Sequence, residues 1–354
     1  MMLTKLDKLV VLQRGIEDMT GNWLYASGIP STEMTYFGVN CIGNMSPSEA
    51  DRTAMFVRAR YKNERGEAAG FRTSTYPDSP VTVSSTFYGL KALEKLGRLD
   101  SIEPPIRETI FAFVNSCAEG GGFKEDRYSD GPTIQATLRA YEIYSMLGGD
   151  SVRPEAATLD SVSAFLGDYL DENWISYTAM AADFLDRSGL LERDYLQRAA
   201  DVLERSEKND LVIEGDTRRY SGVYIDPSKG EITTNSTPSG IRLLRILKDH
   251  WVKVREPDYA GTLEYILAQR QNPGFTWPSM DIPNIFATYD AKDVITYLYD
   301  AKVIDYDQYM ELTDDMQEFS RMLRGHDGGF LWYSDERVSS AKKRNIIPFP
   351  SRVA

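Results

Sequence analysis

Two acidic side chains stand next to recurring threonines, at positions that suit proton transfer. Asp290 follows one copy of the threonine by two residues, beside Tyr289, and Glu33 precedes another copy by two residues. Burial beside an aromatic ring raises the pKa of a carboxyl group, which then keeps a proton that it can donate. We therefore predict Asp290 as the catalytic acid and Glu33 as the second candidate. The alternative for Asp290 is an ion pair with a neighbouring helix through Lys292 or Arg242.

The threonine belongs to a repeat with a period of about 50 residues. A small residue follows it by three positions in the pairs Thr35 and Gly38, Thr86 and Gly89, Thr137 and Ala140, Thr178 and Ala181, Thr237 and Gly240, and Thr288 and Ala291. An independent signal is a glycine closely followed by an aromatic residue, at Gly21-Asn22-Trp23, Gly70-Phe71, Gly122-Phe123, Gly222-Val223-Tyr224, Gly274-Phe275 and Gly329-Phe330. One copy of this signal is missing near Trp174. The chain is therefore interpreted as six copies of one repeat.

Each unit has the pattern of a helical hairpin, and strand signals are nearly absent. An Asp two residues before a proline, at Asp78, Asp130 and Asp281, is expected to begin the first helix. The second helices are expected at 46–63, 103–118, 155–170, 192–206, 257–270 and 307–324. An open solenoid would need polar caps at its ends, which the terminal units lack. We therefore predict a closed all-α (α/α)6 toroid over 1–335 with a tail over 336–354, in which the helix after each Gly-aromatic segment lies inside.

The Gly-Gly-Phe segments at 121–123 and 328–330, with the Thr-x-x-Gly/Ala helices, resemble the repeat of protein prenyltransferase β-subunits and of squalene and terpenoid cyclases. The resemblance runs from Gly21 to Phe330, and it implies an (α/α)6 toroid whose central cavity holds an isoprenoid chain. It places the zinc ligands of the prenyltransferases at Thr233, Asn235 and Ala287, none of which is a good zinc ligand. It places the acidic motif of the proton-initiated cyclases at 174–179, where no acid stands. We therefore expect neither a zinc site nor the usual cyclase acid.

Residues around each threonine are expected to face this cavity and to bind substrate. They are Tyr36, Phe37, Phe87, Tyr88, Gln135, Arg139, Trp174, Tyr177, Asn235, Phe286 and Tyr289. Aromatic faces suit an isoprenoid chain and stabilise a carbocation, although the same residues could simply wedge the loops together. The resemblance also implies that Arg218, Arg219 and Lys229 in the fifth loop hold a diphosphate, with ordinary surface charge as the alternative.

No cofactor is expected, apart from Mg²⁺ that would accompany a diphosphate substrate. The run Asp314-Asp315-Met316-Gln317-Glu318 has the DDxxE form of a magnesium motif. It falls at the expected start of an outer helix, where acids favour the helix dipole without any metal.

A polar stripe follows each threonine by five and eight residues, as in Lys91, Glu142 and Asp293. It predicts either a charged ring around a polar lumen, which would suit a sugar or a peptide, or a barrel floor filled by alternating ion pairs. The alternation of sign favours the floor.

Composition excludes several functions. The 354 residues carry 53 acidic and 40 basic side chains, and a net charge of −13 is against binding nucleic acid. Two cysteines and two histidines are too few for a disulfide framework. No apolar run is long enough to span a membrane and the N-terminus lacks a cleavage site, so we expect a soluble, cytoplasmic protein.

Together these features favour an isoprenoid-handling enzyme, an atypical terpenoid cyclase or prenyltransferase-like protein acting on a polyprenyl diphosphate or its derivative. The alternatives are an (α/α)6 carbohydrate-active enzyme with two carboxylates, and a non-catalytic binding or scaffold protein on a decayed toroid. Whether a partner subunit exists is left open by the sequence.

Overall fold

The computed structural model describes residues 30–64, 68–74, 79–149, 159–169, 174–212, 218–227, 230, 235–271, 273–276, 283–325 and 327–331. The Gly21-Asn22-Trp23 copy, Asp78, Asp281, Lys229 and the predicted tail over 336–354 lie outside these residues. The domain boundaries therefore stay a prediction.

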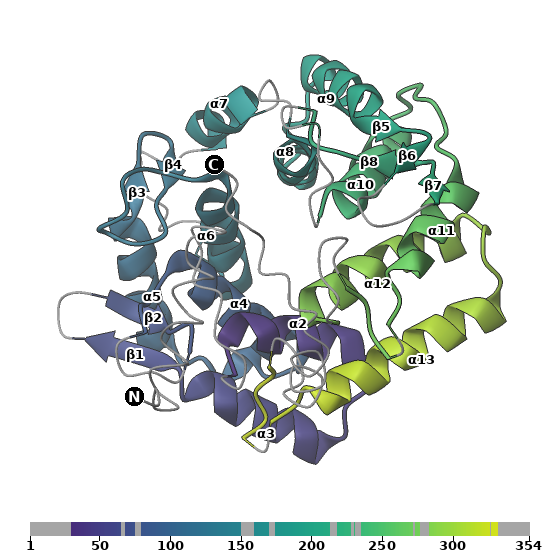
Figure 1. Ribbon diagram of the computed structural model, residues 1–354. Coiled ribbons are helices and arrows are strands. Elements are labelled where there is room, and N and C mark those ends of the chain that lie inside the picture. The colour runs from purple at the N-terminus through teal and green to yellow at the C-terminus, as the bar shows by residue number, and fades with distance from the viewer. Residues whose placement is uncertain are drawn as a thin grey trace, which may run out of the picture.

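The helices of the described residues form two concentric rings (Figure 1). The inner ring consists of α2 (Thr32–Ile42), α4 (Val83–Lys95), α6 (Ile134–Leu147), α8 (Ile175–Arg187), α10 (Ser236–Asp249) and α12 (Ile285–Asp300). Each inner helix contacts the next, and α12 contacts α2, so the ring is closed. The outer ring consists of α3 (Pro47–Arg58), α5 (Pro104–Ser116), α7 (Leu159–Tyr169), α9 (Arg193–Ser206), α11 (Tyr259–Ala268) and α13 (Tyr306–Met322). The predicted all-α toroid, with the threonine helices inside, is confirmed.

Short antiparallel strand pairs join the two rings, and the sequence did not indicate them. They are β1 (Tyr61–Glu64) with β2 (Ala68–Phe71), β3 (Ala118–Glu119) with β4 (Gly122–Phe123), β5 (Glu207–Lys208) with β8 (Val223–Tyr224), and β6 (Leu211–Val212) with β7 (Arg219–Tyr220). The helix expected over 46–63 therefore ends at Arg58, because Tyr61–Glu64 pairs with the following Gly-aromatic segment. Runs of two or four residues are too short to show a strand periodicity.

The recurring threonine ties the Gly-aromatic segment to the start of the next inner helix. The backbone N–H of the aromatic residue donates to the threonine Oγ1 in the pairs Phe71 and Thr86 (3.2 Å), Phe123 and Thr137 (2.9 Å), Tyr224 and Thr237 (3.3 Å), Phe275 and Thr288 (3.1 Å), and Phe330 and Thr35 (3.2 Å). Thr178 differs, because its buried Oγ1 has no hydrogen-bond partner in the described structure. The segment before it, 170–173, is outside the described residues and lacks the Gly-aromatic signal.

The small residue after each threonine makes room for the same aromatic ring. A Cβ atom on Gly38 would lie 2.1 Å from a ring carbon of Phe330, and one on Gly240 would lie 2.3 Å from the ring of Tyr224. The sequence predicted close packing at these small residues. They pack against the aromatic side chain of a Gly-aromatic loop, rather than against a neighbouring inner helix.

The last loop closes the ring on the first helix. The N–H of Ser31 donates to the carbonyl of Phe330 (3.3 Å), and the Thr53 hydroxyl on α3 donates to the carbonyl of Gly328 (2.9 Å). Phe330 therefore has the role for α2 that the repeat pattern assigned to Trp23.

Four inner helices have N-cap residues that follow the loop proline, whereas the sequence predicted a cap before it. Ser31, Thr82, Thr133 and Asn284 each accept the N–H of the residue three positions later. The expectation that Asp130 begins a helix was wrong, because α6 begins after Thr133. A cap must directly precede the first helical residue, and Pro132 keeps Asp130 one turn too early.

Candidate functional site

Six of the predicted substrate-binding residues meet at one place on the inner ring. These residues, called the aromatic cluster below, are Tyr36 and Phe37 on α2, Phe87 and Tyr88 on α4, and Phe286 and Tyr289 on α12. The ring centroids are 4.4 Å apart for Phe37 and Phe286, 4.9 Å for Phe37 and Tyr289, 5.4 Å for Tyr36 and Tyr88, and 5.1 Å for Phe87 and Tyr88. The rings of Tyr36, Phe286 and Tyr289 are only half-buried, which leaves aromatic surface for a ligand.

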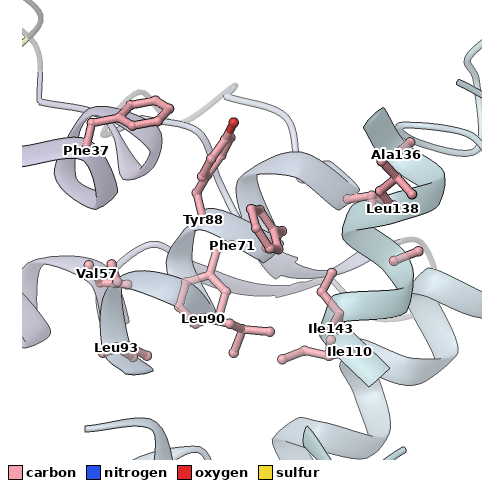
Figure 2. Close-up of a cluster of buried hydrophobic side chains, with 14 of the residues drawn as sticks. Phe37, Val57, Phe71, Tyr88, Leu90, Leu93, Ile110, Ala136, Leu138 and Ile143 are labelled. Carbon is pink, nitrogen blue, oxygen red and sulfur yellow. The ribbon is translucent and has the colours of Figure 1, made fainter. Parts of the chain in front are cut away.

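The aromatic cluster is continuous with the hydrophobic core, because Phe37, Phe87 and Tyr88 belong to the same buried cluster as Leu90 and Leu93. Figure 2 shows Phe37 and Tyr88 close together, whereas Leu90 and Leu93 point to the other side of α4 with Val57. The alternation follows the helix period, because residues two positions apart on a helix face different directions. α4 therefore carries Tyr88 on one side and the aliphatic residues Leu90 and Leu93 on another, within one continuous core.

A chain of polar side chains runs into the aromatic cluster through Tyr88. The Arg139 guanidinium on α6 donates from Nη2 to the Tyr88 hydroxyl (2.7 Å) and from Nη1 to Ser84 Oγ, and its Nη1 lies 3.5 Å from Glu125 Oε1. Glu33, in the first turn of α2, is a further polar neighbour of Tyr88, and the Tyr88 hydroxyl lowers the pKa of the Glu33 carboxyl. Glu33, Tyr88, Arg139, Ser84 and Glu125 are called the polar chain below.

The environment of Glu33 favours its protonated form. Burial raises the pKa of the Glu33 carboxyl, and the Arg139 charge and the Tyr88 hydrogen bond offset part of that rise. Burial also raises the pKa of the Tyr88 hydroxyl well above its ordinary value, so Tyr88 stays a hydrogen-bond donor. The arrangement can therefore hold a proton beside the aromatic cluster and stabilise the carboxylate that remains after the proton leaves.

Asp290 lies in a different place, between α10, α11 and α12. It lines a cavity of about 10 Å³ together with Pro238, Tyr265, Gln269 and Phe275, and this is room for about one water. Burial, and then the negative charge of Asp293, raise the pKa of Asp290 well above its ordinary value. Its surroundings therefore fit a protonated carboxyl group, but the cavity is too small for an isoprenoid.

The cations named as alternative partners of Asp290 bind elsewhere. Arg242 forms an ion pair with Asp293 (3.1 Å), and the Lys292 ammonium donates to the carbonyl of Asn40 on α2. Arg242 still acts on Asp290 through its charge, which lowers the pKa of that carboxyl.

The remaining predicted binding residues do not join the aromatic cluster in the described contacts. Trp174 stacks on Tyr177 of α8 (4.9 Å), and Tyr177 packs against Tyr169 of α7. Gln135 is half-buried in the first turn of α6, and Asn235 is the exposed cap of α10. Arg218 and Arg219 are exposed, and the Arg218 guanidinium lies 5.5 Å from the ring centroid of Tyr220.

The polar stripe forms ion pairs between neighbouring inner helices. Lys91 on α4 and Arg187 on α8 both bind Glu142 on α6 at 3.1 Å, and Arg242 on α10 binds Asp293 on α12. The interpretation of the stripe as alternating ion pairs is confirmed for Lys91 with Glu142 and for Arg242 with Asp293, whereas Arg187 lies outside the predicted stripe.

The DDxxE run does not start a helix. Asp314 and Asp315 lie in the second half of α13, and Asp315 binds Arg270 at 2.9 Å. The expected helix start was wrong because the capping box at Asp305 begins α13 more than two turns earlier. In the described ranges, no group of three or more His, Cys, Asp or Glu side chains could hold a metal ion.

Sequence reasoning missed two members of the polar chain. Ser84 precedes Thr86 by two residues, which is the offset that singled out Glu33, so the same rule could have found it. Glu125 follows Phe123 in a loop, and only the fold brings it to Ser84, whose backbone N–H donates to Glu125 Oε2 (3.0 Å).

Comparison with known proteins supports the fold. No family model and no curated protein sequence matches this chain. Among solved structures, Candida albicans protein geranylgeranyltransferase-I complexed with GGPP is similar, with 17% identity and a TM-score of 0.61 over 80% of this chain and 91% of that one. A type II terpene cyclase from Scytonema, in complex with its product merosterolic acid A, has 14% identity and a TM-score of 0.48 over 83% and 99%. The α/α toroid resemblance inferred from the repeat is confirmed.

No helix in the described part of the chain is long and apolar enough to cross a membrane.

Proposed function

We propose that this protein is an isoprenoid-handling enzyme that binds a polyprenyl diphosphate or its derivative against the aromatic cluster. The observation that carries the proposal is the junction at Tyr88, whose ring packs against Tyr36, Phe37 and Phe87 and which lies beside the half-buried carboxyl group of Glu33. An apolar chain and a proton donor are thereby held at one place on the inner ring.

The aromatic cluster suits the prenyl chain. The ring centroid of Phe37 on α2 lies within 5 Å of those of Phe286 and Tyr289 on the adjacent helix α12. Burying each methylene of a prenyl chain is worth about 0.8 kcal/mol, so that a longer chain binds more tightly as long as the rings reach it. The ring quadrupoles also attract a carbocation.

The polar chain suits a proton-initiated reaction, which favours the cyclase-like form of the proposal. Glu33 donates its proton to an alkene carbon, the π electron pair forms the new C–H bond, and the adjacent carbon becomes a cation beside the rings. The carboxylate of Glu33 then keeps the hydrogen bond from Tyr88, while the charge of Arg139 stabilises it. Glu33 is preferred to Asp290 as the acid because the cavity at Asp290 has room for about one water only.

Arg139 is a positioning residue in this proposal and not the group that holds the anionic head. Its Nη atoms already donate to Tyr88 and Ser84, and Glu125 lies beside them. Arg218 and Arg219 are exposed and so remain the candidates for holding the diphosphate.

Calorimetric titration with farnesyl diphosphate, and with inorganic diphosphate as a head-group control, tests the proposal. Phe37→Leu is expected to weaken farnesyl diphosphate binding about fivefold, because a ring stack is worth about 1 kcal/mol beyond its buried area. Phe184→Leu on α8 is the matched control, since Phe184 is 5 % exposed against 6 % for Phe37 and packs on Tyr141 outside the cluster. Equal losses in both variants would show that the aromatic cluster does not hold the prenyl chain.

Glu33→Gln separates binding from catalysis. The glutamine keeps a hydrogen-bond partner for Tyr88 but has no acidic proton, so farnesyl diphosphate should still bind while product formation is lost. Turnover at the wild-type rate would remove Glu33 from the mechanism.

A further inference from the structure

The proposed acid Glu33 has an arginine as a near neighbour through Tyr88. Glu33 precedes Tyr36 and Phe37 by three and four residues and so lies on the same face of α2. The rings of Tyr36 and Phe37 pack against Tyr88, with centroids 5.4 and 5.5 Å away, and Arg139 donates to the Tyr88 hydroxyl (2.7 Å). A nearby cation favours the ionised form of a carboxyl group, whereas a proton donor must rest in its protonated form. Arg139 alone would therefore work against the proposed role of Glu33.

A second carboxyl group shares the same arginine. Arg139 Nη1 lies 3.5 Å from Glu125 Oε1, and the two side chains are only 17 % and 22 % exposed. The charge of Arg139 lowers the pKa of the Glu33 carboxyl, and the charge of Glu125 raises it. The two groups of this ion pair therefore act on Glu33 in opposite directions.

The surroundings of the two carboxyl groups favour opposite protonation states. Glu125 accepts the backbone N–H of Ser84 (3.0 Å) and also the Ser84 hydroxyl, in the first turn of α4. N–H groups at the start of a helix stabilise a negative charge. Burial is the largest influence on Glu33, and it raises the pKa of that carboxyl although Arg139 is near. Two carboxyl groups in such different environments divide into one ionised group and one proton donor.

We propose that Glu125 is a positioning residue that pairs with Arg139 and thereby keeps Glu33 protonated before the reaction. The inference rests on the proposed function, because it takes Glu33 as the acid. When Glu33 gives its proton to the alkene carbon, its carboxylate becomes a second negative charge near Arg139. The ion pair of Arg139 with Glu125 is long, at 3.5 Å, so little attraction is lost when the guanidinium divides its charge between the two carboxylates.

The loop that carries Glu125 is fixed by its backbone. The N–H of Val83 donates to the Glu125 carbonyl (2.8 Å), and two residues earlier the N–H of Phe123 donates to Thr137 Oγ1 (2.9 Å). Glu125→Gln should therefore remove the charge without releasing the loop. The glutamine also keeps a side-chain oxygen that can accept the N–H of Ser84.

A ¹³C-carboxyl titration of the full-length protein, without any substrate, tests the proposal. The Glu33 resonance is assigned by its loss in Glu33→Gln. The pKa of Glu33 should fall in Glu125→Gln, because the negative charge that raises it has been removed. Glu119→Gln is the matched control, since Glu119 on the nearby strand β3 binds Lys124 at 2.9 Å instead of Arg139. An unchanged pKa of Glu33 in Glu125→Gln would overturn the proposal, and so would an equal fall in Glu119→Gln.

Arg139→Gln tests whether Glu125 acts through the arginine. Alone, this variant should raise the pKa of Glu33, because a neighbouring cation is lost. In the Arg139→Gln background, Glu125→Gln should lower the pKa of Glu33 by much less than it does in the wild-type protein. Equal shifts in both backgrounds would show that the two carboxyl groups repel each other directly, and this would overturn the positioning role.

The pH dependence of product formation from farnesyl diphosphate separates this inference from the proposed function. Turnover requires protonated Glu33, so it should be lost as pH rises through the pKa of Glu33, and this loss should come at a lower pH in Glu125→Gln. A shifted pKa of Glu33 with no turnover in the wild-type protein would contradict the proposed function and support the effect of Glu125 on Glu33. Turnover with the same upper pH limit in both proteins would overturn the role of Glu125 and leave the proposed function standing.

Discussion

Replacement of the recurring threonine by valine should destabilise the protein at every copy that binds a loop. Thr137 accepts the N–H of Phe123 at 2.9 Å and donates to the carbonyl of Thr133 at 2.7 Å. Valine has nearly the same shape but offers neither bond, so the Phe123 N–H is left buried without a partner. Leaving one buried donor unsatisfied costs about 1–3 kcal/mol, which is the expected loss for Thr137→Val.

The chain contains its own control for this prediction at Thr178. The Thr178 Oγ1 is buried and has no partner in the described residues, so Thr178→Val removes an unsatisfied polar atom instead of breaking a bond. This variant should be neutral or slightly more stable than the wild type. The two substitutions are chemically identical, and both threonines are fully buried.

Urea unfolding followed by circular dichroism, with thermal melts in parallel, measures the two free energies. The account expects a lower midpoint for Thr137→Val and an unchanged or higher one for Thr178→Val, with equal slopes. Equal losses in both variants would refute the idea that the repeat threonine acts as a loop anchor, and would leave only its packing as the reason for its recurrence.

Three further outcomes are expected from the same structure. Gly38→Ala should lower the free energy of unfolding by about 1–3 kcal/mol in a denaturant titration, because the new Cβ would lie 2.1 Å from the ring of Phe330. Gly131→Ala is the control and should have little effect, since no atom lies within 4 Å of its Cβ position. Equal effects of the two variants would contradict the packing of the Phe330 ring against Gly38. The pKa of Asp290 in the folded protein lies well above its ordinary 3.8, so the native state binds the proton more tightly and stability falls as pH rises above about 4. Asp290→Asn should therefore gain melting temperature relative to wild type as pH rises above that point, and a pH-independent difference would contradict this. A double-mutant cycle on Lys91 and Glu142, whose side chains are half-buried, should give a coupling free energy of about 1 kcal/mol or less in protein stability, and this coupling should fall with added salt. A coupling that salt does not change would argue against a simple ion pair.

The repeat was readable from the sequence because both of its signals are local geometric needs. A threonine must accept one N–H, and a glycine or alanine three residues later must admit one ring, so these two positions tolerate few other residues. The closed ring followed from the same pattern. The sequence did not indicate that Phe330 closes the ring by binding Thr35, because no local feature distinguishes a loop that binds the next helix from one that binds the first.

The candidate site was only partly readable. The six aromatic residues lie at the predicted offsets from three threonines, and the inner ring brings them together because α2 contacts both α4 and α12. Trp174 and Tyr177 precede Thr178 by four and one residues and were also expected to face the cavity, but they lie at the start of α8, where they stack on each other. The offset of a residue from the repeat threonine gives the face of the helix on which it lies, but not its distance from residues on other helices of the inner ring. The preference between Asp290 and Glu33 as the acid therefore depended on where the structure places them.

The most direct test of the central claim is a calorimetric comparison of geranyl, farnesyl and geranylgeranyl diphosphate, with inorganic diphosphate titrated to saturation beforehand. Inorganic diphosphate lowers the apparent affinity of all three ligands at a shared head-group site by the same factor, so the prenyl chain is the only variable in the comparison. The account predicts that affinity rises with chain length in the wild-type protein and that the rise is much smaller in Phe37→Leu. Affinities that do not depend on chain length would contradict the proposal that the aromatic cluster binds an isoprenoid.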